Sequence, residues 1–372
     1  MFCTSGLLIK KLQMAGDDSM AKCSHLILDE IHERDISTDI LLLAVRRLLS
    51  LNKKLKVVIM SATLDADKFH NYFSESGELT VGTPIKIETS TNFPVASFHL
   101  EDAIGALKRK KMFPNTMSSF TRQFIDKEMA GDDALPDIVP VEIVSHLAKY
   151  LHETKPDGSI LCFLPGWEDI VSVKNDLEII LSRTAKPYKL YCIHSSAPPE
   201  VAQSIFQRTD GERKIILATN IAESSITIPD VAFVIDSGKQ KINMYSPALR
   251  MNSLNTTWIS RSNSIQRLGR VGRTQPGEYY LLASRSRELS PSLPPEILRV
   301  GLEDVCLSIK GLGFQGPLRD IVSELLDKPN KIALRDAVNR LVQLGALEPE
   351  TENITSLGKI LSSIPLNPSK TN

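Results

Sequence analysis

The sequence predicts an α/β fold made of parallel β-sheets with crossover helices, followed by a smaller helical domain. Two observations indicate this class. Short apolar runs alternate with helical patterns along most of the chain, which is typical of parallel strands joined by helices. After Tyr280 the pattern becomes helical. A chain of 372 residues that is 42% hydrophobic can bury the cores of two or three globular units.

The first part of the chain contains two apolar runs, each followed by a helical pattern. Strands are expected at 24–29 (SHLILD) and 56–60 (KVVIM), and helices at 39–51 and 65–73. Residues 81–98 are rich in β-forming residues but include Pro84 and Pro94. We assign residues 1–100 to a first sheet domain.

Residues 103–136 differ in character from the segments on either side. They contain the basic run Lys108–Lys111 and the acidic pair Asp132–Asp133. We therefore expect residues 101–137 to be an inter-domain linker or a variable insertion. The basic run suits either a solvated helix face or an RNA site, and the first of these is the more common in proteins.

A second α/β pattern spans residues 138–285. Helices are expected at 141–153 and from Trp167 onward, and strands at 159–163, 189–193, 214–218 and 231–235. Residues 286–372 then carry amphipathic helices at 302–310 and 333–344 and a predicted β-hairpin at 346–364. Helices followed by a small hairpin are typical of a winged helix.

Composition and charge exclude some classes of function. The 44 basic and 44 acidic residues balance, so any RNA contact must come from a local groove rather than from net charge. No apolar run reaches the roughly 18 residues that span a bilayer, and the N-terminus lacks the layout of a signal peptide. The five cysteines are scattered, which predicts reduced, mostly buried thiols in an intracellular protein, either cytoplasmic or nuclear, with mitochondria left open.

The first chemical motif is Asp29-Glu30-Ile31-His32, directly after an apolar strand. Nucleotide hydrolysis needs one acid to hold Mg²⁺ and another to orient the attacking water, and parallel strands deliver such side chains to a ligand crevice. A strand that simply ends in two exposed acids gives the same pattern. The triplet Ser61-Ala62-Thr63 after the next strand favours the nucleotide interpretation, although by itself Thr63 suits an ordinary helix cap.

Two further blocks carry polar residues at places where phosphates bind. TNIAESSITIPD, residues 219–230, follows the strand KIILA, at a junction where backbone N–H groups point outward. An elaborate helix cap is the alternative. QRLGRVGR, residues 266–273, spaces three arginines among glycines. On a helix Arg270 and Arg273 share a face that Arg267 does not, which suits two guanidinium groups aimed at a γ-phosphate.

Six segments of the chain together closely resemble motifs II to VI of the DEAH/DExH helicases of superfamily 2. In chain order they are DEIH, SAT, FLPG (163–166), HSSAP (194–198), TNIAESSITIPD and QRLGRVGR. CTSGLL (3–8) resembles the RNA-contacting segment before DEIH, and residues 294–313 resemble the entry to the family's winged helix. DEIH with FLPGWEDI points to the subgroup of the maleless and G-quadruplex-resolving helicases. The resemblance, weakest at 103–136, implies tandem RecA-like domains, the first incomplete, and a partial winged-helix domain.

The resemblance also implies residues for ATP hydrolysis. Asp29 and Glu30 would hold Mg²⁺ with the nucleotide and position the water, and His32 would connect this site to Ser61 and Thr63. The γ-phosphate side and the nucleotide sensors of the second domain would be formed by Gln266, Arg270, Arg273, Ser225 and Thr227.

RNA is the partner that the resemblance implies, and a protein activator is a second expected partner. The residues along the RNA backbone would be Thr4, Ser5, Gly6, Gly166, Ser195, Thr219 and Asn220. Such contacts to phosphate and sugar give affinity without sequence readout. Residues 237–257 should hold the strand-separating β-hairpin of the family.

One motif of the family is absent from the sequence. No GxxxxGK[ST] loop, which binds the phosphates and the metal, occurs in it. In the family this loop precedes DEIH, so we expect it upstream of residue 1, with further domains downstream of residue 372. Without the strand that carries the loop, the first sheet should expose an edge and part of its core.

Three functions compete on these grounds. The leading hypothesis is an ATP-dependent RNA helicase, of which this chain is a fragment without its phosphate loop. The second is a catalytically inactive remnant that binds RNA or a protein. The third, a DNA helicase or remodeller of the same superfamily, is disfavoured by the TNIAESSITIP block and by the winged-helix entry.

Overall fold

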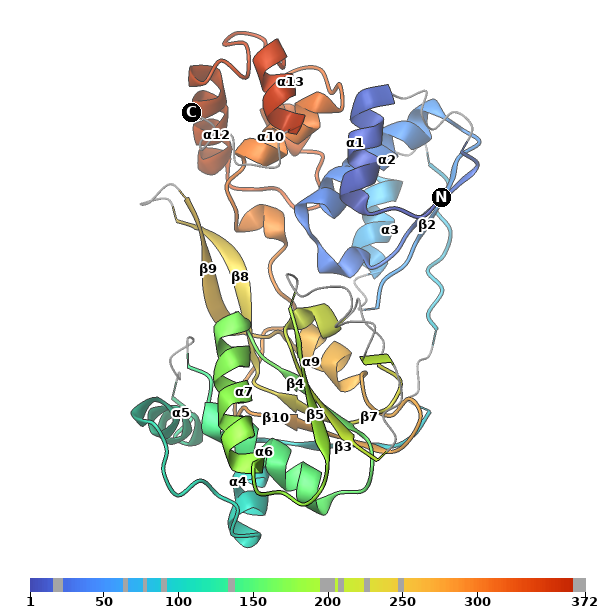
Figure 1. The fold of residues 1–372 in the computed structure, drawn as a ribbon. Coiled ribbons are helices and arrows are strands. Elements are labelled where there is room, and N and C mark those ends of the chain that lie inside the picture. The colour runs from blue at the N-terminus through green and yellow to red at the C-terminus, as the bar shows by residue number, and fades with distance from the viewer. Residues whose placement is uncertain are drawn as a thin grey trace. The chain divides into compact units, whose positions relative to one another are not determined.

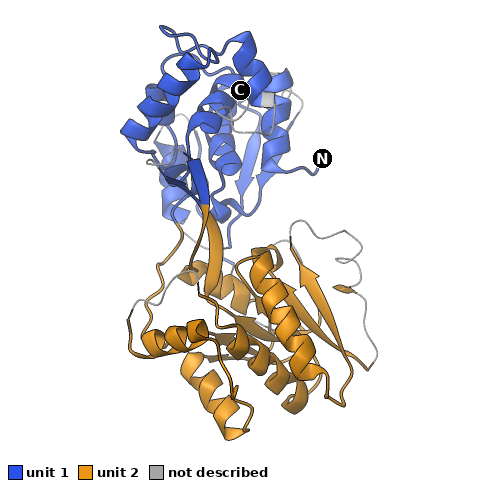
Figure 2. Ribbon diagram, turned by 60° about the vertical axis from the view of Figure 1, so that its left-hand side comes forward, with its two compact units in different colours: residues 1–87, 243–253, 294–372 blue, residues 88–242, 254–293 orange. Residues whose placement is uncertain are grey.

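The computed structural model describes residues 1–15, 23–62, 66–75, 79–87, 92–132, 138–194, 205–206, 211–223, 228–246 and 251–363. The chain forms two compact units (Figure 2). Unit 1 consists of Met1–Ile87, Asn243–Ser253 and Pro294–Asn372, and unit 2 consists of Glu88–Ile242 and Leu254–Leu293. Unit 1 therefore joins the two ends of the chain in one body.

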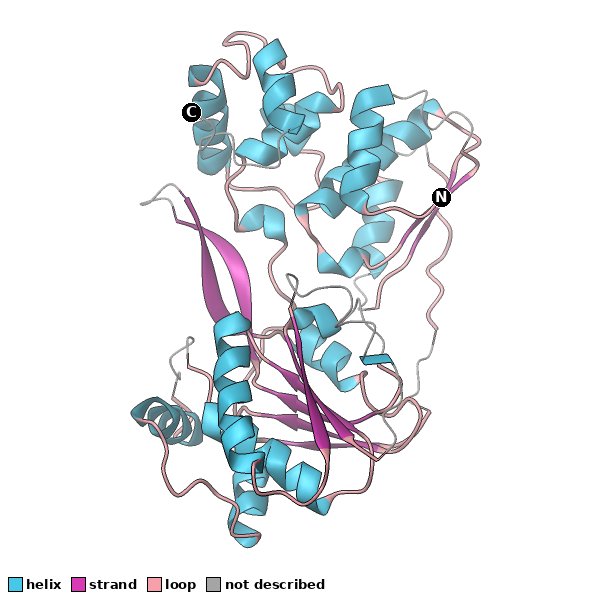
Figure 3. Ribbon diagram, in the orientation of Figure 1, coloured by secondary structure: helices cyan, strands magenta, loops and turns pink. Residues whose placement is uncertain are grey.

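Unit 2 is built on a six-stranded parallel sheet (Figure 3). Its strand order is β3 (Val95–Phe98), β10 (Gly277–Leu281), β7 (Val231–Asp236), β4 (Ser159–Phe163), β6 (Arg213–Ala218) and β5 (Tyr188–Ile193). Every residue of β4, β6 and β7 is buried, as expected for central strands that helices cover on both faces. The predicted parallel sheet of the second domain is confirmed.

Successive residues of β4 supply the cores on the two faces of this sheet. Ile160 and Cys162 belong to one core, with side chains from α4 (Leu100–Arg109), α5 (Ser119–Met129), α6 (Val141–Thr154) and α7 (Trp167–Leu181). Leu161 and Phe163 belong to the other, on the side of α9 (Arg261–Leu268) and η3 (Asn220–Ala222). Figure 1 shows α6 and α7 lying along the sheet.

Two segments differ from the sequence-based expectation. Of the β-rich stretch 81–98 only β3 forms a strand, and it pairs with β10 in the sheet of unit 2. Residues 101–137, expected to be a linker or insertion, contain most of α4 and all of α5, which bury Leu107 and Phe124. Apolar faces on these two helices draw the segment onto the sheet. The basic run ends α4 with exposed side chains.

Unit 1 contains a two-stranded parallel sheet, β1 (His25–Leu28) and β2 (Lys56–Ile59), among the residues that the structure describes. Around it lie α1 (Ser5–Ala15), α2 (Ile36–Leu51) and α3 (Ala66–Ser74). Ile27 is 61% exposed and Val58 is 46% exposed. The sheet therefore leaves apolar strand residues in water.

The core of unit 1 is completed by helices from the C-terminal part of the chain. Buried residues of α10 (Glu303–Gly311), α11 (Leu318–Val322) and α12 (Lys331–Gln343) form one cluster with those of α1, α2 and α3. The side chain of Gln13 donates a hydrogen bond to the Ser308 carbonyl at 3.0 Å. The N-terminal elements and the C-terminal helices of unit 1 therefore share one hydrophobic core.

Of the two predicted hairpins, only one has the expected form. Residues 237–257 hold β8 (Lys239–Ser246) and β9 (Met251–Trp258), which pair as a two-stranded sheet. The hairpin at 346–364 is wrong: it consists of a single antiparallel bridge between Leu347 and Ile354, followed by α13 (Ser356–Ser363). Thr355 explains the helix, because its Oγ1 accepts the Gly358 N–H at 3.0 Å as an N-cap.

All five cysteines are free. Cys162 and Cys306 are buried, Cys23 and Cys192 are partly buried, and Cys3 is exposed. The prediction of reduced thiols agrees with this, although fewer of them are buried than expected. Within the described part of the chain, no helix combines the length and the apolar character needed to cross a bilayer.

Asp327 connects three elements of unit 1. It accepts hydrogen bonds from Lys68 on α3 at 2.7 Å and from Arg34 at 2.6 Å, and Arg34 also donates to Asp39 on α2 at 2.7 Å. Partial burial acts to raise the pKa of Asp327, but these two cations hold the pKa below its ordinary value. Arg34 directly follows η2 (Ile31–Glu33), so the network anchors the segment that carries DEIH.

We expect Asp327→Asn to destabilise unit 1 by about 2 kcal/mol at pH 7, because two partly buried cations lose their partner. A carboxyl with a lowered folded-state pKa stabilises above its ordinary pKa and loses this effect as the pH falls through the lowered value. The difference from wild type should therefore shrink near pH 3. Hydrogen exchange of the α2 amides measures it. Asp320→Asn, in an exposed pair with Arg319, is the matched control. Equal protection in both variants at pH 7 would contradict the anchoring.

Candidate functional site

The DEIH segment turns sharply at the end of β1. The Met60 N–H donates to the Leu28 carbonyl at 2.8 Å, and the Ile31 N–H donates to the Met60 carbonyl at 3.3 Å. These bonds fix the segment against the end of β2. Glu30 has φ of 55° and Arg34 has φ of 50°, in a region that non-glycine residues rarely adopt. Two such residues on either side of η2 show that the surrounding bonds impose this conformation.

His32 connects Glu30 to the segment after β2. The Ala62 N–H donates to His32 Nδ1 at 3.2 Å, so the ring proton is assigned to Nε2, which lies 3.4 Å from Glu30 Oε2. The His32 side chain is 8% exposed, whereas that of Glu30 is 47% exposed. The geometry holds the imidazole in place and leaves the carboxylate open to a ligand.

Asp29 and Glu30 fit a magnesium ion that is carried largely by a nucleotide. Both are exposed at the end of β1, and Asp29 Oδ1 accepts the Glu30 N–H at 2.9 Å. The described residues contain no group of three or more His, Cys, Asp or Glu side chains able to hold a metal. Mg²⁺ usually takes one or two carboxylates together with phosphate oxygens and water, and Asp29 and Glu30 are two exposed carboxylates of this kind.

The residues predicted to contact RNA from unit 1 begin helix α1. Thr4 Oγ1 accepts the Leu7 N–H at 3.3 Å, and Ser5 is the first residue of the helix. A Cβ on Gly6 would lie 3.5 Å from Ser37 Oγ, which is ordinary contact. Thr4 is exposed, and Ser5 and Gly6 are partly exposed, so a ligand can reach all three.

In unit 2 the predicted RNA-contacting residues follow the ends of paired strands. β4 and β6 pair from Ile160 with Ile215 to Phe163 with Ala218. Gly166 comes three residues after β4 and precedes α7, and Thr219 and Asn220 come directly after β6. All three lie at the carboxyl edge of the sheet, where parallel α/β sheets bind ligands. Asn220 is exposed there, whereas Gly166 and Thr219 are buried. Thr63, Ser195, Ser225 and Thr227 lie outside the described residues.

The expectation that Arg270 and Arg273 share a helix face is wrong. Helix α9 ends at Leu268, so both arginines lie in the turns beyond it. Arg270 Nη2 donates to the Glu223 carbonyl, and Arg273 Nε donates to the Gly269 carbonyl at 2.9 Å. The C-cap of α9 is Gly269, and Gly272, with φ of 74°, turns the chain beyond it. Gln266 remains on the last turn of α9, partly exposed.

Arg267 has a different environment from the other two arginines. Its side chain is 1% exposed, with Nε 2.9 Å from Glu223 Oε2 and Nη1 2.7 Å from Asp236 Oδ1. Its guanidinium also lies over the Phe163 ring, 4.8 Å from the centroid. Burial acts to lower the pKa of Arg267, but the two carboxylates raise the pKa above its ordinary value. Arg267 therefore links the TNIAE block to the end of β7.

The same cluster reaches the base of the β8–β9 hairpin. Asp236 Oδ1 accepts the Gly238 N–H at 2.8 Å, and Asp236 Oδ2 accepts the Tyr279 hydroxyl at 2.7 Å. Arg267 Nη1 lies 3.4 Å from the Lys239 carbonyl, at the first residue of β8. Gly238 has φ of 70°, and a Cβ there would lie 2.8 Å from the Trp258 ring. The start of β8 is thus fixed to the helix that carries QRLGR.

Two sequence profiles match the chain. One is described as "Helicase conserved C-terminal domain" and matches residues 142–275, and the other as "Helicase associated domain (HA2), winged-helix" and matches residues 337–366. The chain is 36% identical over 371 residues to ATP-dependent RNA helicase DHX30 of Gallus gallus. It is 33% identical over 404 residues to ATP-dependent DNA/RNA helicase DHX36 of Homo sapiens. Each of these alignments covers 99% of the chain.

The chain belongs to the DEAH/DExH helicases of superfamily 2. Two crystal structures of E. coli HrpB, described as a DExH-box NTPase and as a DEAH/RHA helicase, agree in fold with this member of the family. They are 25% identical to it, with TM-scores of 0.71 and 0.73, and cover 98% of the chain. The chain spans 28% of the DHX30 relative, 39% of the DHX36 relative and 39% to 40% of the HrpB chains.

Three residues that organise the site of unit 2 in this DEAH/DExH chain were not predicted from the sequence. They are Glu223, Asp236 and Arg267. Glu223 was part of a recognised block but received no role. Asp236 ends the apolar strand VAFVID, much as Asp29 ends LILD, and this was the available signal. Arg267 was set apart only because it did not share a helix face with the other arginines.

We expect Arg267→Met to destabilise unit 2 by about 3–5 kcal/mol, because two buried carboxylates lose their cation. Tyr279→Phe, which removes one hydrogen bond to Asp236, should cost about 1 kcal/mol. Chemical denaturation followed by tryptophan fluorescence measures this, since both tryptophans, Trp167 and Trp258, belong to unit 2. Arg261→Met, at the exposed start of α9, is the matched control. A loss for Arg267→Met no larger than that of the control would refute the assigned anchoring.

Proposed function

We propose that this chain is the motor part of an ATP-dependent RNA helicase, in which RNA-stimulated NTP hydrolysis drives translocation and unwinding. The observation that carries the proposal is the Glu30–His32–Ala62 connection. It ties a strand-end acid pair to the SAT segment, so a change at one can reach the other. The relatives DHX30 and DHX36 are named ATP-dependent helicases of RNA and of DNA/RNA, which supports the same activity here.

The nucleotide chemistry is assigned to residues of both units. Asp29 and Glu30 would hold Mg²⁺, which neutralises developing charge on the phosphates when it is bound with ATP. Glu30, open to solvent, accepts a hydrogen bond from the water that attacks, and His32 Nε2 orients its carboxylate. Arg270, Arg273 and Gln266 stabilise the γ-phosphate side. Arg270 leaves the Glu223 carbonyl when it does so, which links nucleotide binding to the segment after Asn220.

RNA binding is assigned to the exposed N-terminus of α1 and to the carboxyl edge of the unit 2 sheet. The residues are Thr4, Ser5, Gly6, Gly166, Thr219 and Asn220, with Ser195 beyond the described part. The β8–β9 hairpin separates the strands in this proposal. An intracellular setting, where ATP and RNA are found, and a protein activator are part of the same proposal.

A second candidate function is a catalytically inactive RNA- or protein-binding remnant. The observation that favours it is the absence of GxxxxGK[ST] from the sequence. The intact mass of the native protein distinguishes the two. A mass well above 41.2 kDa with peptides that contain the loop supports the helicase, whereas a mass of 41.2 kDa supports the remnant.

We expect Glu30→Gln to reduce ATP turnover at least about 100-fold in a protein that carries this chain together with the phosphate loop, because the water loses its acceptor. ATP and RNA affinities should stay within about two-fold of wild type. Steady-state hydrolysis and filter binding measure the two effects. Glu33→Gln, which makes the same charge change at an exposed position of η2, should turn over normally. Equal rates for Glu30→Gln and wild type would disprove the catalytic assignment.

We expect Arg270→Ala to reduce hydrolysis about 100-fold or more while changing RNA affinity less than about three-fold, since the guanidinium stabilises transferring phosphate. The same two assays measure this, with Arg261→Ala as the control for loss of an arginine near α9. A collapse of RNA affinity with normal hydrolysis would instead assign Arg270 to the RNA groove.

A further inference from the structure

Trp167 is a large aromatic side chain left in water beside a predicted RNA contact. It is the first residue of α7, directly after Gly166, and is 49% exposed. Single exposed apolar residues are ordinary on proteins, so exposure by itself does not define a site. Leaving an indole half exposed to water costs free energy, however, because its large apolar surface stays unburied. Exposed indoles at binding edges commonly contact partners.

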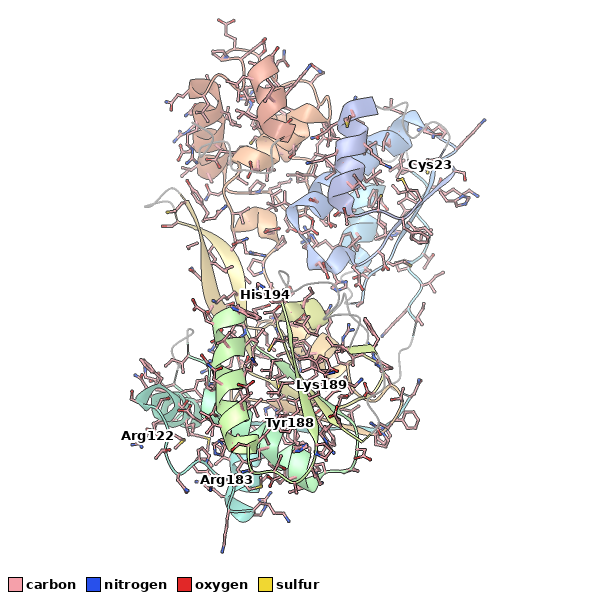
Figure 4. The ribbon with its side chains drawn as sticks, viewed as in Figure 1. Cys23, Arg122, Arg183, Tyr188, Lys189 and His194 are labelled. Carbon is pink, nitrogen blue, oxygen red and sulfur yellow. The ribbon has the colours of Figure 1, made fainter. Side chains whose placement is uncertain are left out.

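A second ring stands next to it. His194 directly follows β5, and its ring centroid lies 6.0 Å from that of Trp167, with 57° between the ring planes. Figure 4 shows His194 at the end of β5, near the first turn of α7. The two rings come from different strand-end segments, 27 positions apart, and together make an aromatic surface at the carboxyl edge of the sheet.

A cation from the hairpin completes this group. A Cβ added to Gly166 would lie 2.8 Å from Lys241 Nζ, so the ammonium group of this β8 residue lies directly over the glycine. Glu168 and Asp169 follow Trp167 in the first turn of α7, and Asp169 interacts electrostatically with Lys241. These two carboxylates would repel a phosphate group placed against the indole. They would not repel a base, because the π-face of a base carries no net charge.

We propose that Trp167, supported by His194, is a stacking platform for one base of the bound RNA strand, with Lys241 beside Gly166 for the adjoining phosphate. The proposal rests on the RNA-binding function proposed above and adds a base contact to a set assigned to the backbone. Stacking on an aromatic side chain is tolerant of sequence, because every base has a π-face. The platform therefore strengthens binding without selecting a sequence.

The experiment uses the full chain without nucleotide and two single-stranded oligonucleotides of equal length, one of ordinary RNA and one in which all bases are removed. Wild type should bind the ordinary RNA about ten-fold or more tighter than the abasic strand, as expected for base stacking. Trp167→Leu should lose this preference while keeping its affinity for the abasic strand. Trp167→Phe should retain part of it, which also shows that the position tolerates change.

Tryptophan fluorescence gives a second readout, because the chain has two tryptophans. Trp258 already carries the cationic groups of Lys239 and Arg287 over its ring, 3.2 Å and 4.4 Å from the centroid, so it is not the tryptophan that we expect a base to contact. Ordinary RNA should quench the wild-type signal and leave the Trp167→Leu signal unchanged. Ile179→Ala, at a 72% exposed position of the same helix, is the matched control and should behave as wild type.

The outcomes separate this inference from the function on which it rests. Equal affinity of wild type and Trp167→Leu for ordinary RNA, without quenching, overturns the platform but leaves RNA binding intact. A loss of affinity for both strands in Trp167→Leu shows a structural effect and also overturns it. Failure of wild type to bind either strand contradicts the proposed function, and the platform with it.

Discussion

The buried guanidinium of Arg267 is the constraint on which the arrangement of unit 2 depends. A charge with 1% exposure persists only where its hydrogen-bonding directions are filled, and Glu223, Asp236 and the Lys239 carbonyl fill them. Each partner belongs to a different segment: the one after β6, the end of β7 and the start of β8. One side chain therefore fixes the places where the polar block, the sheet and the hairpin meet. Arg270 is positioned by the same contacts, because it donates a hydrogen bond to the Glu223 carbonyl.

In unit 1 a different set of charged residues holds the chemical motif in position. The acid pair at the end of β1 is followed by a backbone with left-handed residues at both ends, which the local sequence does not favour. Arg34 offsets this by bonding Asp39 on α2 and Asp327 near the C-terminal helices. Burial raises the pKa of Asp39, and the arginine opposes that shift. In both units an arginine to which no contact with nucleotide or RNA is assigned holds the motif in position, as precise placement of reacting groups requires.

Much of the fold followed from local pattern, and the failures share a physical cause. Buried strands such as 159–163 and 214–218 were predictable because continuous apolar runs between helices have few alternatives. The strand after Pro94 was assigned to the wrong sheet, because its partner β10 lies about 180 positions away and pairing at that distance leaves no trace in spacing. The structural role of Arg267 was not predicted for the same reason. Its partners Glu223 and Asp236 are distant in sequence and meet it only in the folded chain. The wrong hairpin after Ala346 arose from apolar residues that suit a strand but follow a threonine cap.

Strand β8 brings the two halves of the unit 2 site together. Its first residue, Lys239, offers its carbonyl to Arg267, and Lys241, two positions later, lies over Gly166 beside Trp167. Lys239 and Lys241 belong to the same strand, so the contacts of Arg267 and the position of Lys241 over Gly166 both depend on where the start of β8 lies. The base of the hairpin is held further by Lys239 and Arg287, whose cationic groups lie over the Trp258 ring, and by the Arg287–Glu128 pair, in which Glu128 is fully buried. The start of β8 is therefore one segment whose place decides both the surroundings of the buried arginine and those of the exposed indole, because neither set of contacts can form if this segment lies elsewhere.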